Sequence, residues 1–407
     1  MKILQINTTI NSGSTGKIAE QIGILLIKNG NKSFIAYGRN HKKSSSYIFR
    51  IGTNFQILIN GLETRLFDNH AFGLKRGTKE LISFIDKIKP DIIHIHNLHG
   101  YYINIFILFN YLKTINIPII MTLHDCWTFT GHCAHFDFIG CEKWKTHCMN
   151  CPQIHAYPAS LFIDRSYRNF DEKRKLFNSI EKIVIVPVSD WLNGLVMESF
   201  LGSKKTIVIK NGIDLNIFKP SQSRESIAKE YDLKGNHIII AVASVWSPRK
   251  GLSDILQIAD SLGNDYSFII IGGRIKKSAI KLSNVKIIKK TENQERLAEL
   301  YSAADLFINP SYEDTLPTTN IEALACGTPV LTYNTGGSPE IIDEKTGFIV
   351  PKGDIDSMTN IIRHFSKKDK DAMTIACRKR AEKYFNKDER FMDYLKLYEN
   401  ILSDRFE

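Results

Sequence analysis

The chain has 407 residues, of which 54 are Lys or Arg and 43 are Asp or Glu, and its formal net charge is +11. This length suits two domains, and a hydrophobic fraction of 43% excludes a disordered chain, because each half can bury a core. No apolar run reaches 18 residues, and the N-terminus lacks a signal-peptide layout, so a cytoplasmic protein without a spanning helix is expected.

The first half alternates short apolar runs with helical patterns. A strand is predicted over residues 2–7, and a helix follows whose apolar positions recur at helical spacing until Gly30. Further strands are predicted at 33–38, 91–96, 117–124, 183–188 and 205–210. This alternation is typical of βαβ units around a parallel sheet.

The second half repeats the same rhythm, with strands predicted at 237–245, 267–273, 285–289, 305–311 and 329–333. The predicted fold is therefore α/β, with two Rossmann-like, doubly wound parallel-sheet domains facing a cleft. We place the first domain at 1–215, with a Cys-rich insertion at 126–151, and the second at 216–385. No strand follows the last amphipathic run, so residues 386–407 are expected to pack back on the first domain.

Polar segments after the predicted strands are the candidate ligand sites, because ligands of such sheets bind beyond the carboxyl ends of the strands. Gly13 and Gly16 precede the first helix and could let an anion approach its N–H groups, although a plain tight turn explains them equally well. Arg249 and Lys250 follow the strand that ends near Ser244. Two cations at the start of a helix favour a bound diphosphate, and two solvated cations are the alternative.

A third segment, at 310–330, carries Glu313 and Asp314 at a predicted strand end and Glu322 on the next helix. Carboxylates in these places can accept hydrogen bonds from sugar hydroxyls, and the N–H groups of the helix start can hold a phosphate. A capping carboxylate and a solvent-facing glutamate are the alternatives.

Five of the seven cysteines lie within residues 126–151. Cys133, Cys141, Cys148 and Cys151 end in a C-x-x-C pair, which suits a tetrahedral structural zinc, with His132, His135 and His147 as reserve ligands. Free or redox-active cysteines and disulfides are the alternatives. The histidines of HIHNLHG (94–100) fit a polar strand end better than a metal site, since no carboxylate is near in sequence.

The third segment resembles the donor-site signature of glycosyltransferase family 4, a retaining family with the two-domain GT-B fold. The pair Lys250-Gly251, NGID at 211–214, TGGSPEII at 335–342 and KTGFIV at 345–350 lie in the matching order, so the similarity covers nearly the whole chain. HDCWTFTGHC and the cysteines after it resemble a subgroup that assembles colanic acid, O-antigen or capsule repeat units.

The resemblance implies roles for individual residues. His124, Lys250 and Asp314 are expected to be catalytic, with Lys250 holding the donor diphosphate and His124 contacting the donor sugar. Asp314 stands where the family has its first glutamate, which leaves open whether it or Glu313 takes that role. Val245 stands where the family has an arginine, a loss for which Arg249 is expected to compensate. The implied donor-binding residues are Gly13, Gly16, Asn211, Ser244, Arg249, Lys250, Glu313, Asp314, Thr315, Leu316 and Glu322.

The expected function is retaining, metal-independent transfer of a hexose from a nucleotide sugar, UDP in preference to GDP, to a lipid-diphosphate-linked saccharide during surface polysaccharide assembly. No cofactor is expected for catalysis. Residues 1–190 carry +9 of the net charge, which favours peripheral binding to an anionic membrane surface over nucleic acid. The alternatives are a sugar-nucleotide epimerase of the same fold and a zinc-containing nucleic-acid-binding protein.

Overall fold

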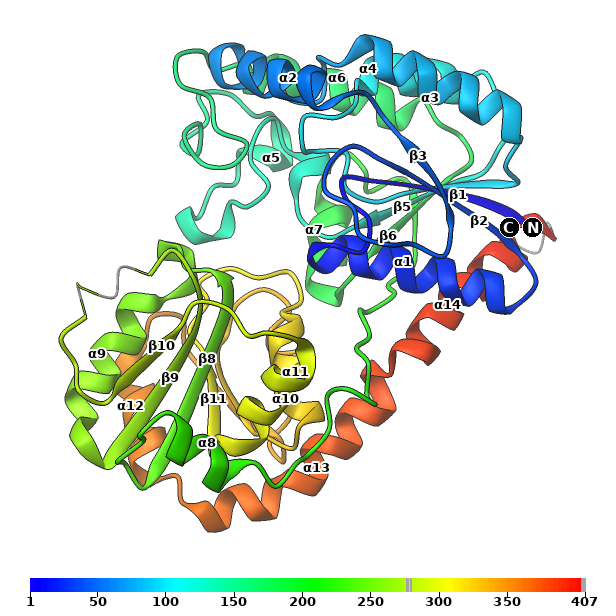
Figure 1. Ribbon diagram of the computed structural model, residues 1–407. Helices are drawn as coiled ribbons and strands as arrows, with labels where there is room; N and C mark the ends of the chain where they lie inside the picture. Colours follow the sequence, from blue (N-terminus) through cyan, green and yellow to red (C-terminus); the bar gives the residue numbers. More distant parts are fainter. Residues whose placement is uncertain (276–277, 279, 404–407) are drawn as a thin grey trace. The chain divides into compact units, whose positions relative to one another are not determined.

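The computed structural model describes residues 1–275, 278 and 280–403, and Figure 1 shows how their helices and strands are arranged. The chain divides into two compact units. Unit 1 consists of Met1–Lys210 together with the segment that starts at Phe391, and unit 2 consists of Asn211–Arg390. The chain therefore passes from one unit to the other twice.

Unit 1 is built on a seven-stranded sheet in the order β3-β2-β1-β4-β5-β6-β7, in which every pairing is parallel. The strands are β1 (Lys2–Asn7), β2 (Lys32–Tyr37), β3 (Tyr47–Arg50), β4 (Ile92–Ile95), β5 (Ile119–Leu123), β6 (Ile183–Pro187) and β7 (Lys205–Thr206). Its helices are α1 (Gly13–Lys28), α2 (Asn54–Phe67), α3 (Lys75–Ile88), α4 (Ile105–Leu112), α5 (Lys143–Thr146), α6 (Ser166–Asn178), α7 (Asp190–Glu198) and α14 (Lys387–Leu402). The strand predicted over 205–210 is thus only two residues long.

The C-terminal helix α14 completes the core of unit 1. Its Phe391, Tyr394, Leu395 and Tyr398 pack with the apolar positions of α1 against β1, β4, β5 and β6. The Tyr398 hydroxyl also lies 2.7 Å from Nδ1 of His94, a fully buried residue of β4. A helix more than 300 residues along the chain from β1 therefore covers part of the same sheet face as the first helix.

Unit 2 holds a six-stranded, all-parallel sheet in the order β10-β9-β8-β11-β12-β13. The strands are β8 (His237–Val245), β9 (Tyr266–Gly273), β10 (Val285–Ile288), β11 (Leu306–Asn309), β12 (Val330–Tyr333) and β13 (Gly347–Val350). The helices are α8 (Arg224–Glu230), α9 (Leu252–Leu262), α10 (Gln294–Ala303), α11 (Thr318–Ala325), α12 (Ile355–His364) and α13 (Lys367–Phe385). The prediction of two doubly wound parallel-sheet domains is confirmed.

Two polar segments differ from the prediction in their local structure. Gly13 and Gly16 form the first turn of α1 instead of a loop before it, and β11 ends at Asn309, so Glu313 and Asp314 lie in the following loop. The strand predicted over 305–311 ends before Pro310, because proline has no N–H to donate to a neighbouring strand.

Candidate functional site

The candidate site of unit 2 lies at the point where its strand order reverses. The chain leaves β8 in one direction, toward β9 and β10, and returns on the other side of β8 as β11. The loops after β8 and β11 therefore start from neighbouring strand ends, the usual place for a ligand in an open parallel sheet. Both loops carry residues predicted to bind the donor, Arg249 and Lys250 on the first and Glu313 to Leu316 on the second.

Hydrogen bonds tie the two loops together. The Tyr312 N–H donates to the Arg249 carbonyl oxygen at 2.8 Å, and Nη1 of Arg249 donates to the Glu313 carbonyl oxygen at 3.0 Å. Gly251 has φ +69°, and a Cβ there would overlap the Pro310 carbonyl oxygen. Glycine is therefore required directly after Lys250, because only glycine allows this turn and this approach.

Lys250 and Asp314 form an ion pair through Nζ and Oδ2, and each side chain is about one-fifth exposed. The backbone of Asp314 is fixed as well, because its carbonyl oxygen accepts a hydrogen bond from the Gly337 N–H at 3.1 Å. The prediction treated Lys250 as a cation that needs an external anion. Instead, a carboxylate of this chain meets it, and both charged groups are held at the edge of the sheet.

Helix α11 contributes the second acidic residue of the site. The Glu322 carboxylate accepts a hydrogen bond from the Tyr301 hydroxyl at 3.1 Å. Glu313, Thr315 and Leu316 are buried in the preceding loop. Nearby in the chain, the buried side-chain atoms Ser311 Oγ, Asn320 Nδ2 and Ser338 Oγ have no hydrogen-bond partner among the residues that the structure describes. The sequence analysis did not select these three polar groups, although they lie within the segments 310–330 and 335–342 that resemble the family.

The remaining predicted donor residues belong to other segments of the chain. Ser244 is exposed near the end of β8, and Asn211 is buried in the segment that pairs with the start of α14. Gly13 and Gly16 belong to unit 1, where a Cβ on Gly16 would crowd Thr9 Oγ1 at 2.6 Å. The close packing at Gly16 is a structural reason for a glycine that needs no ligand.

His124 follows β5 directly in unit 1 and belongs to a chain of hydrogen bonds. Its Nε2 lies 3.2 Å from His96 Nδ1, His96 Nε2 lies 3.0 Å from Gln5 Oε1, and Gln5 Nε2 donates to the Ala19 carbonyl oxygen. The last bond fixes the Gln5 amide, so His96 must donate from Nε2 and accept at Nδ1. His124 then donates from Nε2, which makes its Nδ1 the acceptor nitrogen. Burial lowers the pKa of His124 to about 4, so the imidazole is neutral at pH 7.

A second polar pair at the same sheet edge was not predicted. His99 Nε2 lies 2.7 Å from Asp125 Oδ2, and Asp125 Oδ1 accepts from the Trp127 N–H at 2.9 Å. Burial raises the pKa of Asp125, but the interaction with His99 outweighs it and keeps this pKa below its usual value. Asp125 directly follows His124 in the sequence, so it could have been selected as a candidate residue. Its contact with His99 could not be predicted, because the two residues are far apart in the chain.

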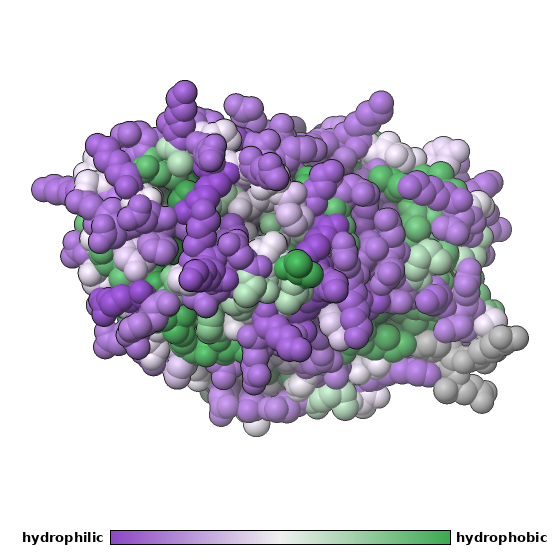
Figure 2. All heavy atoms as spheres, turned by 90° about the horizontal axis from the view of Figure 1, so that it is seen from below, coloured by the Kyte–Doolittle hydropathy of each residue, from purple (hydrophilic) through white to green (hydrophobic). Residues whose placement is uncertain are grey.

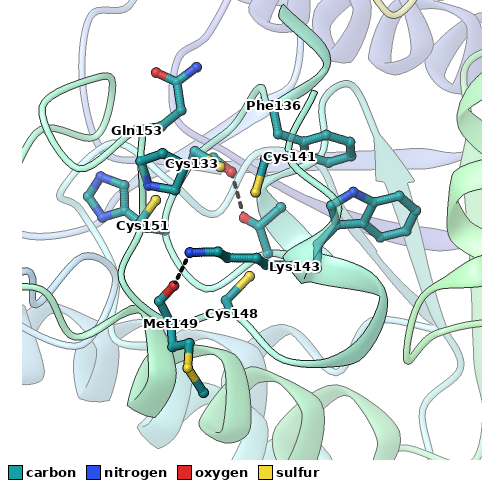
Figure 3. Close-up of a pocket in the computed structure, with 12 residues that line it drawn as sticks. Cys133, Phe136, Cys141, Lys143, Cys148, Met149, Cys151 and Gln153 are labelled. Carbon is teal, nitrogen blue, oxygen red and sulfur yellow. Dashed lines mark hydrogen bonds between the residues drawn. The ribbon is translucent and has the colours of Figure 1, made fainter. Parts of the chain in front are cut away.

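The four clustered cysteines line one small pocket of unit 1, shown in Figure 3. Cys133 and Cys151 are hydrogen-bonded to each other, and this bond lowers the pKa of the Cys151 thiol to about 7. Burial raises the pKa of Cys148 to about 11. All four cysteines are free thiols in the structure.

Basic side chains surround these thiols. Lys143 lines the pocket and donates from Nζ to the carbonyl oxygens of Met149 and Asn150. Lys173 is buried close to Cys133 and Cys148, and burial lowers its pKa to about 7. His132 also lines the pocket: its Nδ1 lies 2.6 Å from Asp68 Oδ1, and its buried Nε2 has no hydrogen-bond partner within the described part of the chain. Within residues 1–275, 278 and 280–403, however, no group of three or more His, Cys, Asp or Glu side chains is arranged to hold a metal ion.

Comparison with known proteins finds a family similarity in unit 2. Residues 223–384 match the family model described as glycosyl transferases group 1. Most of unit 2 is therefore similar to group 1 glycosyltransferases. This match includes the loops after β8 and β11, and it supports glycosyltransferase activity for the chain.

Relatives extend the similarity beyond unit 2. A protein of Escherichia coli (strain K12), named "Putative colanic acid biosynthesis glycosyl transferase WcaC", is 26% identical over 87% of this chain and 88% of its own length. The N,N'-diacetylbacillosaminyl-diphospho-undecaprenol alpha-1,3-N-acetylgalactosaminyltransferase of Campylobacter jejuni is 24% identical over 59% of this chain and 65% of its own length.

Solved structures show the same two-domain fold. Sucrose-phosphate synthase from Thermosynechococcus elongatus superposes with a TM-score of 0.74 at 16% identity and covers 99% of both chains. HepE of Anabaena in complex with UDP and glucose gives a TM-score of 0.68 at 14% identity, over 98% of this chain and 99% of its own. These likenesses establish the GT-B fold.

Proposed function

We propose that this glycosyltransferase transfers a hexose from a nucleotide sugar to a lipid-diphosphate-linked saccharide, with retention of configuration. The Lys250–Asp314 pair is the observation that carries the donor site, because it holds a cation and a carboxylate at the switch point of unit 2. A bound diphosphate would replace Asp314 as the ion-pair partner of Lys250. The Asp314 carboxylate would then accept hydrogen bonds from sugar hydroxyls. Glu322 would bind the ribose hydroxyls.

The choice of donor and acceptor rests on the comparisons. HepE was solved with UDP and glucose, which supports a UDP donor, and the Campylobacter enzyme is named for a diphospho-undecaprenol acceptor. The WcaC relative supports a role in surface polysaccharide assembly. Catalysis without a metal is part of the proposal, because Lys250 and the α11 N-terminus would stabilise the leaving diphosphate.

We also propose that Cys133, Cys141, Cys148 and Cys151 hold a structural zinc. Four thiolates would give the centre a double negative charge, which Lys143 and protonated His132 would partly compensate. Burial lowers the pKa of Lys173 to about 7, and the nearby thiolates would favour its protonated form. The unpartnered Nε2 of His132, oriented through Nδ1 by Asp68, fits the polar surroundings of such a centre. The thiols would have to move to reach ligand geometry.

Membrane attachment is proposed as well. No helix in the described part of the chain has the length and apolar character to cross a bilayer. The basic residues Lys28, Lys32, Lys42 and Lys43 of unit 1 are exposed, as the prediction of a peripheral contact requires. Each would contribute about 1 kcal/mol near an anionic surface.

The donor-site proposal is tested by Lys250→Ala. Loss of the cation should lower kcat about 10²–10³-fold with a panel of UDP and GDP sugars, because charge on the leaving diphosphate is no longer neutralised. The control is Lys379→Ala, an exposed lysine of α13 in the same unit. Equal kcat in the two variants, with unchanged thermal unfolding, would remove Lys250 from the site.

A further inference from the structure

Helix α2 presents its apolar side chains to solvent. Among its residues only Asn60 and Thr64, both polar, are buried. Asn60 Nδ2 donates to the Tyr101 carbonyl oxygen at 2.8 Å, and Thr64 Oγ1 donates to the Asn60 carbonyl oxygen at 2.8 Å. This orientation is the reverse of an ordinary surface helix, which buries its apolar stripe.

The exposed side forms a continuous apolar stripe. Phe55 is 70% exposed, Leu58 61% and Leu62 49%, at positions i, i+3 and i+7 of the helix. A neighbouring loop extends it, because the Leu161 N–H donates to the Arg65 carbonyl oxygen at 2.7 Å. We call this surface the α2 apolar face; its exposed residues are Phe55, Leu58, Ile59, Leu62, Leu66, Phe67, Leu161 and Phe162.

Both ends of α2 are anchored, so this orientation is built into unit 1. Thr53 and Gln56 form a capping box at the N-terminus. At the C-terminus, Asp68 is fully buried and binds His132 and the Arg165 N–H at 2.6 and 2.8 Å. The hydrophobic effect disfavours so many large apolar side chains in water, which indicates that something covers this face.

Basic residues outnumber acidic ones on the segments that border the α2 apolar face, where Glu63, Asp164 and Glu80 are acidic and Glu80 pairs with Arg76. Arg65 is exposed on α2 itself, and the Arg165 guanidinium lies 5.9 Å from the Phe67 ring centroid. The start of α3 adds the exposed residues Lys75, Arg76 and Lys79. By contrast, hydrophilic side chains cover most of the molecular face shown in Figure 2, with apolar ones scattered between them. An apolar face with a cationic border is typical of helices that lie in the interface of an anionic membrane.

We propose that the α2 apolar face inserts into the headgroup and acyl-chain boundary of an anionic bilayer. The apolar side chains would enter the lipid, while Arg65, Arg165 and Lys75 contact lipid phosphates. This inference rests on the proposed peripheral attachment, for which charge was the only argument. It changes the expected salt dependence of membrane binding. Binding through a purely electrostatic contact would be lost in high salt, whereas an inserted helix keeps part of its affinity.

The test uses the full chain without donor or acceptor, so that it is independent of sugar transfer. Wild-type protein is sedimented with phosphatidylglycerol vesicles and with phosphatidylcholine vesicles, at low and high salt. We expect binding to the anionic vesicles, partly retained at high salt. Leu58→Ser with Leu62→Ser should weaken it at least about tenfold, because two apolar side chains no longer enter the lipid.

The matched control is Ile375→Ser, which removes an apolar side chain that is 65% exposed on α13 of unit 2. It should bind vesicles as the wild type does, and all variants should keep the wild-type unfolding temperature. Equal vesicle binding by the Leu58/Leu62 variant and the control would overturn the proposal. So would a wild-type dimer in sedimentation velocity that the two serine substitutions dissociate, because a second copy would then cover the face.

Discussion

At the scale of single residues, the chemistry of the candidate sites is decided by neighbours from distant parts of the chain. Lys250 meets Asp314, which is 64 residues further on, and His94 of β4 contacts Tyr398 of α14. His96 and Gln5 likewise fix the tautomer of His124. Residue type alone therefore does not tell which histidine is charged, which is buried and which faces a ligand.

The buried histidines predict how stability depends on pH. Burial lowers the pKa of His94 to about 3 and that of His124 to about 4, below the value of about 6.5 expected in the unfolded chain. Between these pKa values the unfolded chain binds more protons than the folded chain does. The free energy of unfolding should therefore fall as the pH is lowered from about 7 to about 4. Urea unfolding at a series of pH values measures this slope.

The variant His94→Asn should flatten the slope, because one of the titrating groups is gone. A control substitution of His364, which is exposed on α12, should leave the slope as it is. A slope that His94→Asn does not change would show that this histidine is not held neutral by the fold.

At the scale of elements, the segment 126–151 has little regular structure to stabilise it. It contains two three-residue 3-10 helices and the four-residue helix α5, with side chains such as Trp127, Phe129 and Trp144 buried between them. Segments this short gain little from backbone hydrogen bonds, so a cross-link between cysteines would matter more here than in the sheet.

If the four cysteines hold zinc, purified protein should contain about one equivalent of the metal by elemental analysis. Cys148→Ser with Cys151→Ser should remove the zinc and lower the unfolding temperature of unit 1, while kcat per folded molecule changes less. Cys377→Ala, which alters a buried thiol of unit 2, should leave the metal content intact. Metal-free wild-type protein of unchanged stability would contradict the proposal.

At the scale of the whole molecule, the chain runs through unit 1, then unit 2, and returns to unit 1 with its last helix. The buried residues Phe391, Tyr394, Leu395, Leu397 and Tyr398 of α14 belong to the core of unit 1. Each large apolar side chain contributes on the order of 1.5–3 kcal/mol when it is buried. The stability of unit 1 therefore depends on a segment that is synthesised after the whole of unit 2.

Truncation after Arg390 removes only the part of α14 that belongs to unit 1, so it should destabilise unit 1 and spare unit 2. Hydrogen exchange should show faster opening of β4 and β5, whose His94 and Thr122 lose the Tyr398 and Tyr394 hydroxyls. The strands of unit 2 serve as the internal control. Equal exchange in β4 with and without the helix would mean that α14 adds nothing to this core.

The sequence by itself determined the parallel-strand pattern, the two-domain α/β fold and the polar segments that follow the strands. These are local properties, because a run of apolar residues or a glycine after a lysine is read within a few positions. Only the tertiary structure decided the ion pair between Lys250 and Asp314, since the strand order brings their loops together. The same holds for α2: periodicity predicts that a helix has an apolar side, but packing decides whether that side faces the core or the solvent.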